Sequence, residues 1–159
     1  MLSRGSEVRA GAPGTGRTRG GRQGEARLPQ AEKQPTVVVA DGDWASGFMI
    51  GETLSGAGMV VTVCADGAEL LEAAPGAGAV VVALPLPDIT TAEVLPRLRA
   101  RCGWATAVIA TGASASAEVQ VAAYEAGADV YLPMPLNPAL LRAVVRAQTA
   151  RAGRLVTAA

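Results

Sequence analysis

Short runs of Val, Ala, Leu and Ile alternate along the chain with longer segments in which apolar residues recur at helical spacing. The short runs are bounded by Gly, Pro or Asp and are apolar at nearly every position. This pattern is typical of strands that are buried on both faces of a parallel sheet. It predicts five strands, at Thr36–Ala40, Met59–Ala65, Ala79–Leu84, Thr106–Ala110 and Asp129–Leu132.

The remaining segments predict five helices. They run from Trp44 to about Gly56, over Gly67–Ala74, from a cap at Thr90 or Thr91 to about Arg101, from Ser114 or Ser116 to a stop at Gly127, and from Pro138 to Arg151. Asp66 and Asn137 are expected to cap the second and fifth helices, because their side chains can accept hydrogen bonds from the first backbone amides. Thr90 or Thr91 is expected to cap the third helix, and Ser114 or Ser116 the fourth. The last two helices are expected to turn apolar faces towards the core, formed by Val119, Ala122, Ala123 and Ala126 and by Leu140, Leu141, Val144 and Val145.

Strands and helices therefore alternate from residue 36 to residue 151. With short connections and right-handed crossovers, this order predicts one doubly wound α/β domain, a parallel sheet with helices on both faces. In such sheets the functional crevice lies at the carboxyl ends of the strands. Those ends are expected to present Asp41, Gly42, Asp43, Ala83, Thr111 and Met134.

Residues 1–35 differ from the rest in composition. They are rich in Gly, Arg, Pro and Gln and lack apolar periodicity, which predicts a disordered tail, and residues 152–159 are predicted to fray. The tail holds seven cations and three acids, whereas residues 36–159 hold seven Arg and eleven acids. Residues 17–22, RTRGGR, resemble a fragment of an RGG-type segment and indicate at most weak nucleic-acid binding. A solvated tail, or upstream sequence read from a misassigned start codon, are the alternatives.

The residue types also exclude several kinds of chemistry. The chain has no His and a single Lys, Lys33, so no imidazole base and no lysine inside the domain is available. Cys64 and Cys102 form no metal or redox motif, and both are expected to be reduced packing residues. No apolar run reaches the roughly 20 residues of a membrane span. The N-terminus has no apolar h-region, so a secretory signal is not expected. A cytoplasmic protein is therefore expected.

Four segments together resemble the receiver domain of bacterial two-component response regulators. VVVADGD at 37–43 is similar to that family's first strand and acidic turn, and LPDITTAEVL at 86–95 to the loop and helix after the phosphoacceptor strand. AVIATG at 107–112 is similar to the fourth strand with its hydroxyl residue. EAGADVYLPMPL at 125–136 is similar to the end of the fourth helix, the fifth strand and the Lys-Pro turn. The resemblance covers 36–151 and implies the flavodoxin-like strand order 2-1-3-4-5.

Active members of this family hold Mg²⁺ with an acidic pair and the acceptor Asp, and bind the phosphoryl oxygens with a Lys and a hydroxyl. Carried over by position, the acidic pair corresponds to Asp41 and Gly42, and the acceptor to Ala83. The hydroxyl residue corresponds to Thr111, the lysine to Met134, and the aromatic residue that responds to phosphorylation to Tyr131. The resemblance therefore implies a pseudo-receiver without a phosphoacceptor Asp, which is not an enzyme and has no cofactor. At most a weak metal site remains, at Asp41 and Asp43.

Simple structural roles are alternatives for these residues. Asp41 and Asp43 could cap the first helix, Thr111 could cap a turn, and Tyr131 could be a half-buried packing residue. Met134 and Ala83 are expected to make the pocket apolar. Large residues near loops, Trp44 and Trp104, are expected in the core or at its rim, and would be interface candidates if exposed.

The expected function is signalling by protein–protein interaction. The resemblance implies a histidine kinase, a regulator or a second copy as the partner, bound through the face of the fourth helix, fifth strand and fifth helix. Because the chain ends soon after the fifth helix, the partner is expected to supply the output. Two alternatives stay open: a small-ligand-binding module that uses the altered pocket, and a phosphorelay receiver that uses another acid, such as Asp88.

Overall fold

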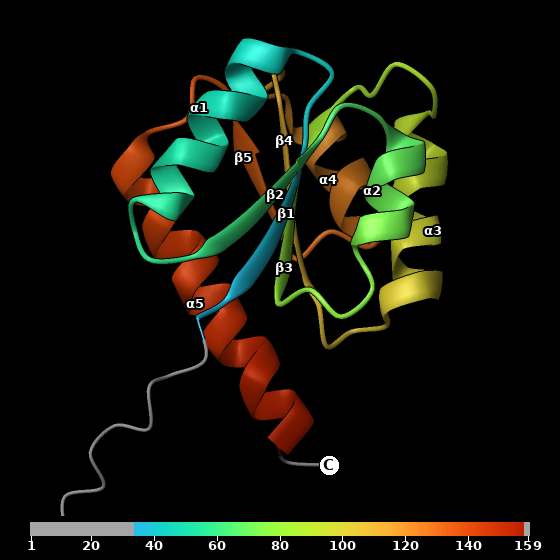
Figure 1. The fold of residues 1–159 in the computed structure, drawn as a ribbon. Coiled ribbons are helices and arrows are strands. Elements are labelled where there is room, and N and C mark those ends of the chain that lie inside the picture. Colours follow the sequence, from blue (N-terminus) through green and yellow to red (C-terminus); the bar gives the residue numbers. More distant parts are fainter. Residues whose placement is uncertain (1–33, 158–159) are drawn as a thin grey trace, which may run out of the picture. The chain divides into compact units, whose positions relative to one another are not determined.

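The computed structural model describes residues 34–157. Five strands form one parallel sheet in the order β2-β1-β3-β4-β5, with helices on both faces (Figure 1). The strands are β1 Thr36–Ala40, β2 Val60–Cys64, β3 Ala79–Leu84, β4 Ala107–Gly112 and β5 Val130–Pro133. The helices are α1 Trp44–Ser55, α2 Gly67–Ala73, α3 Thr91–Cys102, α4 Ala117–Ala126 and α5 Pro138–Thr157. The predicted fold class and strand order are confirmed. The tail predicted to be disordered is 1–35, and its residues 1–33 lie outside the described residues.

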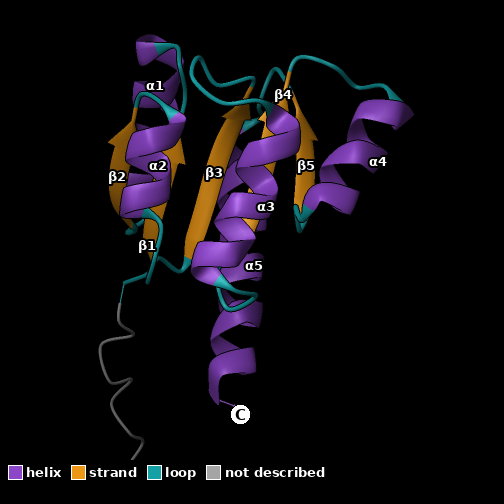
Figure 2. Cartoon of the chain, turned by 90° about the vertical axis from the view of Figure 1, so that its right-hand side faces the viewer, coloured by secondary structure: helices purple, strands orange, loops and turns teal. Residues whose placement is uncertain are grey.

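The sheet lies between two layers of helices. One face is covered by α1 and α5 and the other by α2, α3 and α4, which face the viewer in Figure 2. Val80 and Val82 of β3 pack towards α2, α3 and α4, whereas Val81, between them, packs towards α1 and α5. Because all three side chains are fully buried, β3 must be apolar at every position rather than at every second one.

The helix starts follow the predicted capping residues. The side chains of Asp66, Ser116 and Asn137 accept hydrogen bonds from the backbone amides three residues later. Thr90 precedes α3, but its hydroxyl bonds to the carboxylate of Glu93 instead of a backbone amide. None of the helices within 34–157 has the length and apolarity needed to cross a membrane.

The end of α5 corrects one prediction. The sequence predicts fraying after Arg151, whereas α5 continues to Thr157. Ala152 is buried in the core beneath α1 and α5, and Arg151 is held by Asp129 and Gln148. These tertiary contacts extend the helix where its own sequence carries only a weak signal.

The predicted apolar faces of α4 and α5 are only partly buried. Ala123 is the one buried residue of α4, and Val119 is exposed. In α5, Leu141 and Val145 are buried, but Leu140 is 52% exposed. Since α4 lies over the edge strand β5, it has less sheet to cover than a helix at the centre, and part of its apolar side faces solvent.

Candidate functional site

The carboxyl ends of β1, β3 and β4 bring three predicted site residues into one row. Ala83 of β3 is in register with Thr111 of β4. Asp41 directly follows Ala40, whose partner on β3 is Val82. All three side chains of this strand-end row, Asp41, Ala83 and Thr111, are buried. The prediction that parallel strands place them at one edge of the sheet is confirmed.

Two polar atoms in the strand-end row lack partners. Asp41 Oδ1 accepts a hydrogen bond from Asp43 N at 2.8 Å. Asp41 Oδ2 and Thr111 Oγ1 are buried and have no hydrogen-bond partner in the described part of the chain. A buried polar group without a partner costs about 1–3 kcal/mol, so such groups are rare in native proteins. They flank Ala83, whose methyl group offers neither a donor nor an acceptor.

The turn after β1 holds Gly42 and Asp43. Asp43 is exposed and is the N-cap of α1, where its Oδ1 accepts a hydrogen bond from Ser46 N at 3.0 Å. A capping role is therefore confirmed for Asp43, whereas Asp41 bonds within the turn. Gly42 lies against the loop that follows β3, because a Cβ added at Gly42 would be 3.2 Å from Pro87 Cδ. Within 34–157, no three His, Cys, Asp or Glu side chains lie together as a metal site.

Met134 and Tyr131 come from the fifth strand and the turn after it. Met134 N donates to Gly112 O at 2.8 Å, which ties this turn to the end of β4. The half-buried Met134 side chain lines a groove between α1 and the turn before α5. Tyr131 is buried and its hydroxyl donates to Ser114 O at 2.8 Å. Burial raises the pKa of this hydroxyl.

Asp88 does not join the strand-end row. Its two carboxylate oxygens accept hydrogen bonds from Gly67 N at 2.7 Å and Ala68 N at 3.0 Å, at the N-terminus of α2. The hydrogen bond from Gly67 is the largest of the effects that hold the pKa of the Asp88 carboxyl below its ordinary value. The sequence carries no local signal for this cap, because the capped helix lies about twenty residues earlier in the chain.

Both tryptophans are exposed, which corrects the expectation of core or rim packing. Trp44 is 79% exposed and stacks on Phe48, one turn later in α1, with 5.5 Å between ring centroids. Trp104 is covered on one side by the guanidinium group of Arg99, 4.2 Å from the ring centroid. Trp44 therefore stays an interface candidate, whereas Trp104 packs against a structural arginine.

Neither cysteine forms a disulfide, and both are at least half-buried. Burial is the main cause that raises the pKa of the Cys64 and Cys102 thiols. A raised pKa lowers the fraction of reactive thiolate, which agrees with the expectation of reduced packing residues.

Comparison with known proteins agrees with this geometry. Residues 37–146 match the response regulator receiver domain family. Among solved structures, the CheY-like response regulator receiver domain protein from Methanospirillum hungatei JF-1 superposes with a TM-score of 0.70 at 23% sequence identity. That match covers 76% of this chain and 98% of the other.

Two further structures are similar at somewhat higher identity. The receiver domain of the Francisella response regulator 1452 has 28% identity and a TM-score of 0.69, covering 74% of this chain and 98% of that one. The BeF3-activated receiver domain of Thermotoga maritima DrrB has 27% identity and a TM-score of 0.67, covering 72% and 97%. No curated protein sequence gives a significant match. With most of the described residues matched and the strands in the expected order, the chain belongs to the response regulator receiver domain family.

Proposed function

We propose that this receiver domain signals without being phosphorylated in its strand-end row, and that it acts by binding another protein. The observation that carries the proposal is Ala83. It stands between Asp41 and Thr111, at the end of β3, where the family resemblance places the acceptor carboxylate. A methyl group has no lone pair with which to attack phosphorus.

Two neighbouring positions support the same conclusion. Mg²⁺ requires oxygen ligands in near-octahedral geometry, and with Gly42 the turn after β1 supplies only the carboxylates of Asp41 and Asp43. One oxygen of Asp43 is already used to cap α1. Met134 provides no positive charge for phosphoryl oxygens. The Thr111 hydroxyl alone replaces neither the metal nor the cation.

Asp88 is a poor substitute for the missing acceptor. Both of its oxygens are engaged by backbone amides of α2. To act as a nucleophile, one Asp88 oxygen would have to give up its charge-assisted hydrogen bond to the start of α2, and such bonds are about twice as strong as neutral ones. This engagement favours a structural role for Asp88 over the alternative in which an unusual acid takes up the phosphoryl group.

Acetyl phosphate with Mg²⁺ is expected to leave the intact mass of the wild-type protein unchanged. The variant Gly42→Asp/Ala83→Asp/Met134→Lys is expected to gain one phosphoryl group, because it restores the second acid, the nucleophile and the cation. The matched control carries Ala83→Asn in place of Ala83→Asp and should gain none, since an amide is not a nucleophile. A phosphoryl group on the wild-type protein would refute the proposal, and peptide mapping would identify the acid that carries it.

The design of the restored variant must allow for Pro87. A side chain at Gly42 would require Pro87 to move by a few tenths of an ångström. The double variant Ala83→Asp/Met134→Lys, which leaves Gly42 in place, is therefore measured in parallel. Far-UV circular dichroism of each variant establishes that it is folded before its mass is compared.

The face formed by α4 and β5 supports partner binding. Val121 and Tyr124 of α4 are both exposed. Tyr124 Oη accepts a hydrogen bond from Tyr131 N at 3.2 Å, which holds α4 against the edge strand. Exposed aromatic and aliphatic side chains on a rigid element are typical of interface residues. Receiver domains generally interact with kinases or regulators, and a second copy of the chain is the other candidate.

Val121→Glu is expected to weaken partner binding about tenfold or more, because it buries a charge at the centre of the contact. The full chain would be immobilised and exposed to an extract of the source organism, and the retained proteins would be quantified by mass spectrometry. Self-association would be measured separately by sedimentation. Val60→Glu on the opposite edge strand β2 is the control, since Val60 and Val121 are similarly exposed, at 50% and 53%. The proposed face would be contradicted if Val121→Glu retained the same proteins as the wild type. It would also be contradicted if the wild-type protein bound neither a partner nor a second copy of itself.

A further inference from the structure

A mostly apolar groove lies beside the strand-end row. It has a volume of about 610 Å³ and runs along α1 and the turn that leads from β5 into α5. Its apolar lining includes Met49, Ile50, Met134, Leu136, Pro138 and Leu141. Ile50 and Leu141 belong to the core, whereas Met49 is exposed. Small-molecule sites have volumes of about 300–1,000 Å³ and are lined mostly by apolar side chains, so both size and lining suit an organic ligand.

The groove carries negative charge at the N-terminal end of α1. Asp43 lines it there, and its Oδ2 receives no hydrogen bond from residues 34–157, since only Oδ1 caps the helix. Asp41 does not line the groove, but its carboxylate accepts a hydrogen bond from Asp43 N and so places a second negative charge beside Asp43. No salt bridge in the described part of the chain joins either carboxylate to a cation, and no described Arg lines the groove. The partial positive charge of about one half at the helix start offsets only part of two carboxylates.

We propose that this groove binds an organic cation, with a protonated amine at Asp43 and an apolar body on Met49, Leu136 and Pro138. An ammonium group donates to Asp43 Oδ2 in a charge-assisted hydrogen bond and offsets part of the local negative charge. The unbranched side chains of Met49 and Met134 adapt to the shape of the apolar body. A neutral or anionic molecule of the same shape gains the apolar contacts alone. The site is separate from the partner face on α4, and the phosphorylation experiment does not test it.

The probe is tryptamine, with indole-3-propionate as a compound of similar shape and opposite charge. Each is titrated into the full chain while backbone amide chemical shifts are recorded. Tryptamine is expected to bind with a dissociation constant below about 1 mM, to shift the amides of Met49 and Leu136, and to bind less tightly as salt is raised. Indole-3-propionate is expected not to bind in this range. Asp43→Asn keeps a good N-cap and is expected to weaken tryptamine binding about tenfold or more.

A second variant tests the position of the apolar body. Ala45 lines the groove and is exposed, so Ala45→Trp is expected to fill the groove and abolish tryptamine binding. Ala122→Trp makes the same change at an exposed position of α4 and should bind like the wild-type protein. The proposal is overturned if tryptamine does not bind, if the carboxylate binds as tightly as the amine, or if Asp43→Asn or Ala45→Trp leaves tryptamine binding unchanged.

Discussion

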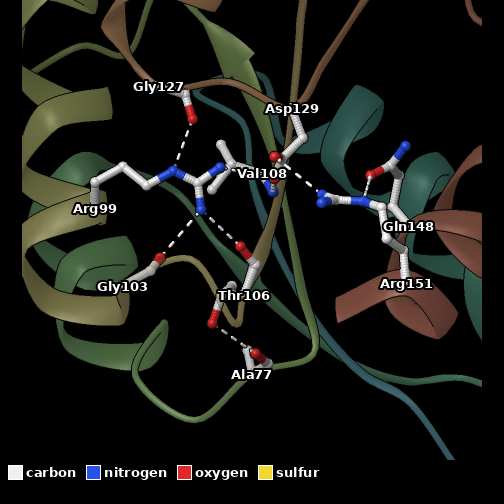
Figure 3. Close-up of polar contacts among 9 residues, drawn as sticks. All are labelled: Ala77, Arg99, Gly103, Thr106, Val108, Gly127, Asp129, Gln148 and Arg151. Carbon is white, nitrogen blue, oxygen red and sulfur yellow. Dashed lines mark hydrogen bonds and ion pairs between the residues drawn. The ribbon is translucent and has the colours of Figure 1, made fainter. Parts of the chain in front are cut away.

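Asp129→Ala is expected to lower the free energy of unfolding by about 3–5 kcal/mol, the range found when one partner of a buried ion pair is removed. Asp129 Oδ2 lies 2.7 Å from Arg99 Nη2 and accepts a hydrogen bond from Val108 N at 2.8 Å (Figure 3). The side chains of Arg99 and Asp129 are only 9% and 12% exposed. Without Asp129, the Arg99 guanidinium would keep three backbone carbonyl partners but lose its counter-charge in a region of low dielectric constant.

Arg151→Ala is the matched control for this prediction. Arg151 Nη2 also contacts Asp129, at 3.0 Å from Oδ1, but its side chain is 43% exposed. Solvent screens such a pair, so the expected loss is at most about 1 kcal/mol. Urea unfolding, followed by tryptophan fluorescence and circular dichroism, gives both free energies. The comparison requires that each variant has the same slope of unfolding free energy against urea concentration (m value) as the wild-type protein. A loss for Asp129→Ala no larger than for Arg151→Ala would contradict the assignment of the Arg99–Asp129 pair as a buried support.

Leu98→Ala is expected to cost about 2–5 kcal/mol, because the surrounding core cannot close fully over the cavity that it leaves. Leu98 lies on the inner side of α3, is fully buried, and belongs to the core cluster that also contains Val94 and Leu95. This core fills the space between β3, β4 and the three helices α2, α3 and α4. A truncation at Leu98 therefore removes contacts that several elements share.

Leu140→Ala is the control, because it deletes the same atoms from a leucine that is 52% exposed. Its expected cost is about 0.5 kcal/mol or less. The same urea experiment compares the two variants. Equal losses would show that Leu140 is buried as the sequence pattern predicts, and would contradict the solvent exposure of the first turn of α5.

The strands β1, β3 and β4 could be predicted because their burial leaves little choice of residue. Val80, Val81 and Val82 face a core on both sides of the sheet, so β3 is visible as an unbroken aliphatic run. Strand ends are less determined by residue type. β4 continues through Thr111 to Gly112 because backbone pairing with β3 continues there, although Thr and Gly are also common in turns.

The strand-end row was predictable for a geometric reason. Parallel strands end at the same edge, so position along each strand is enough to bring Asp41, Ala83 and Thr111 together. Position along the strand does not determine which carboxylate oxygen of Asp41 accepts a hydrogen bond. That depends on rotamers and on turn geometry, which leave Asp41 Oδ1 bonded and Asp41 Oδ2 without a partner.

Sequence patterns did not predict the contacts between segments that lie far apart in the chain. Helical periodicity identifies an apolar side of α4 and α5 but not how much sheet is available to cover it, and Val119 and Leu140 are exposed as a result. The groove beside α1 was missed for the same reason. Its lining joins residues near position 50 to residues near position 136, and only the packing of α1 against α5 brings them together.

The cap that Asp88 places on α2 also has a consequence for the order of folding. With seven residues, α2 is too short to persist alone in water. Its first three amides bond to Asp88 and Asp66, and the loop that carries Asp88 lies so close that a Cβ at Gly67 would clash with Ile89. Because this loop directly follows β3, we expect it to reach α2 once β3 has paired with β1. By this reasoning α2 becomes ordered after β3, although it precedes β3 in the chain and is synthesised first.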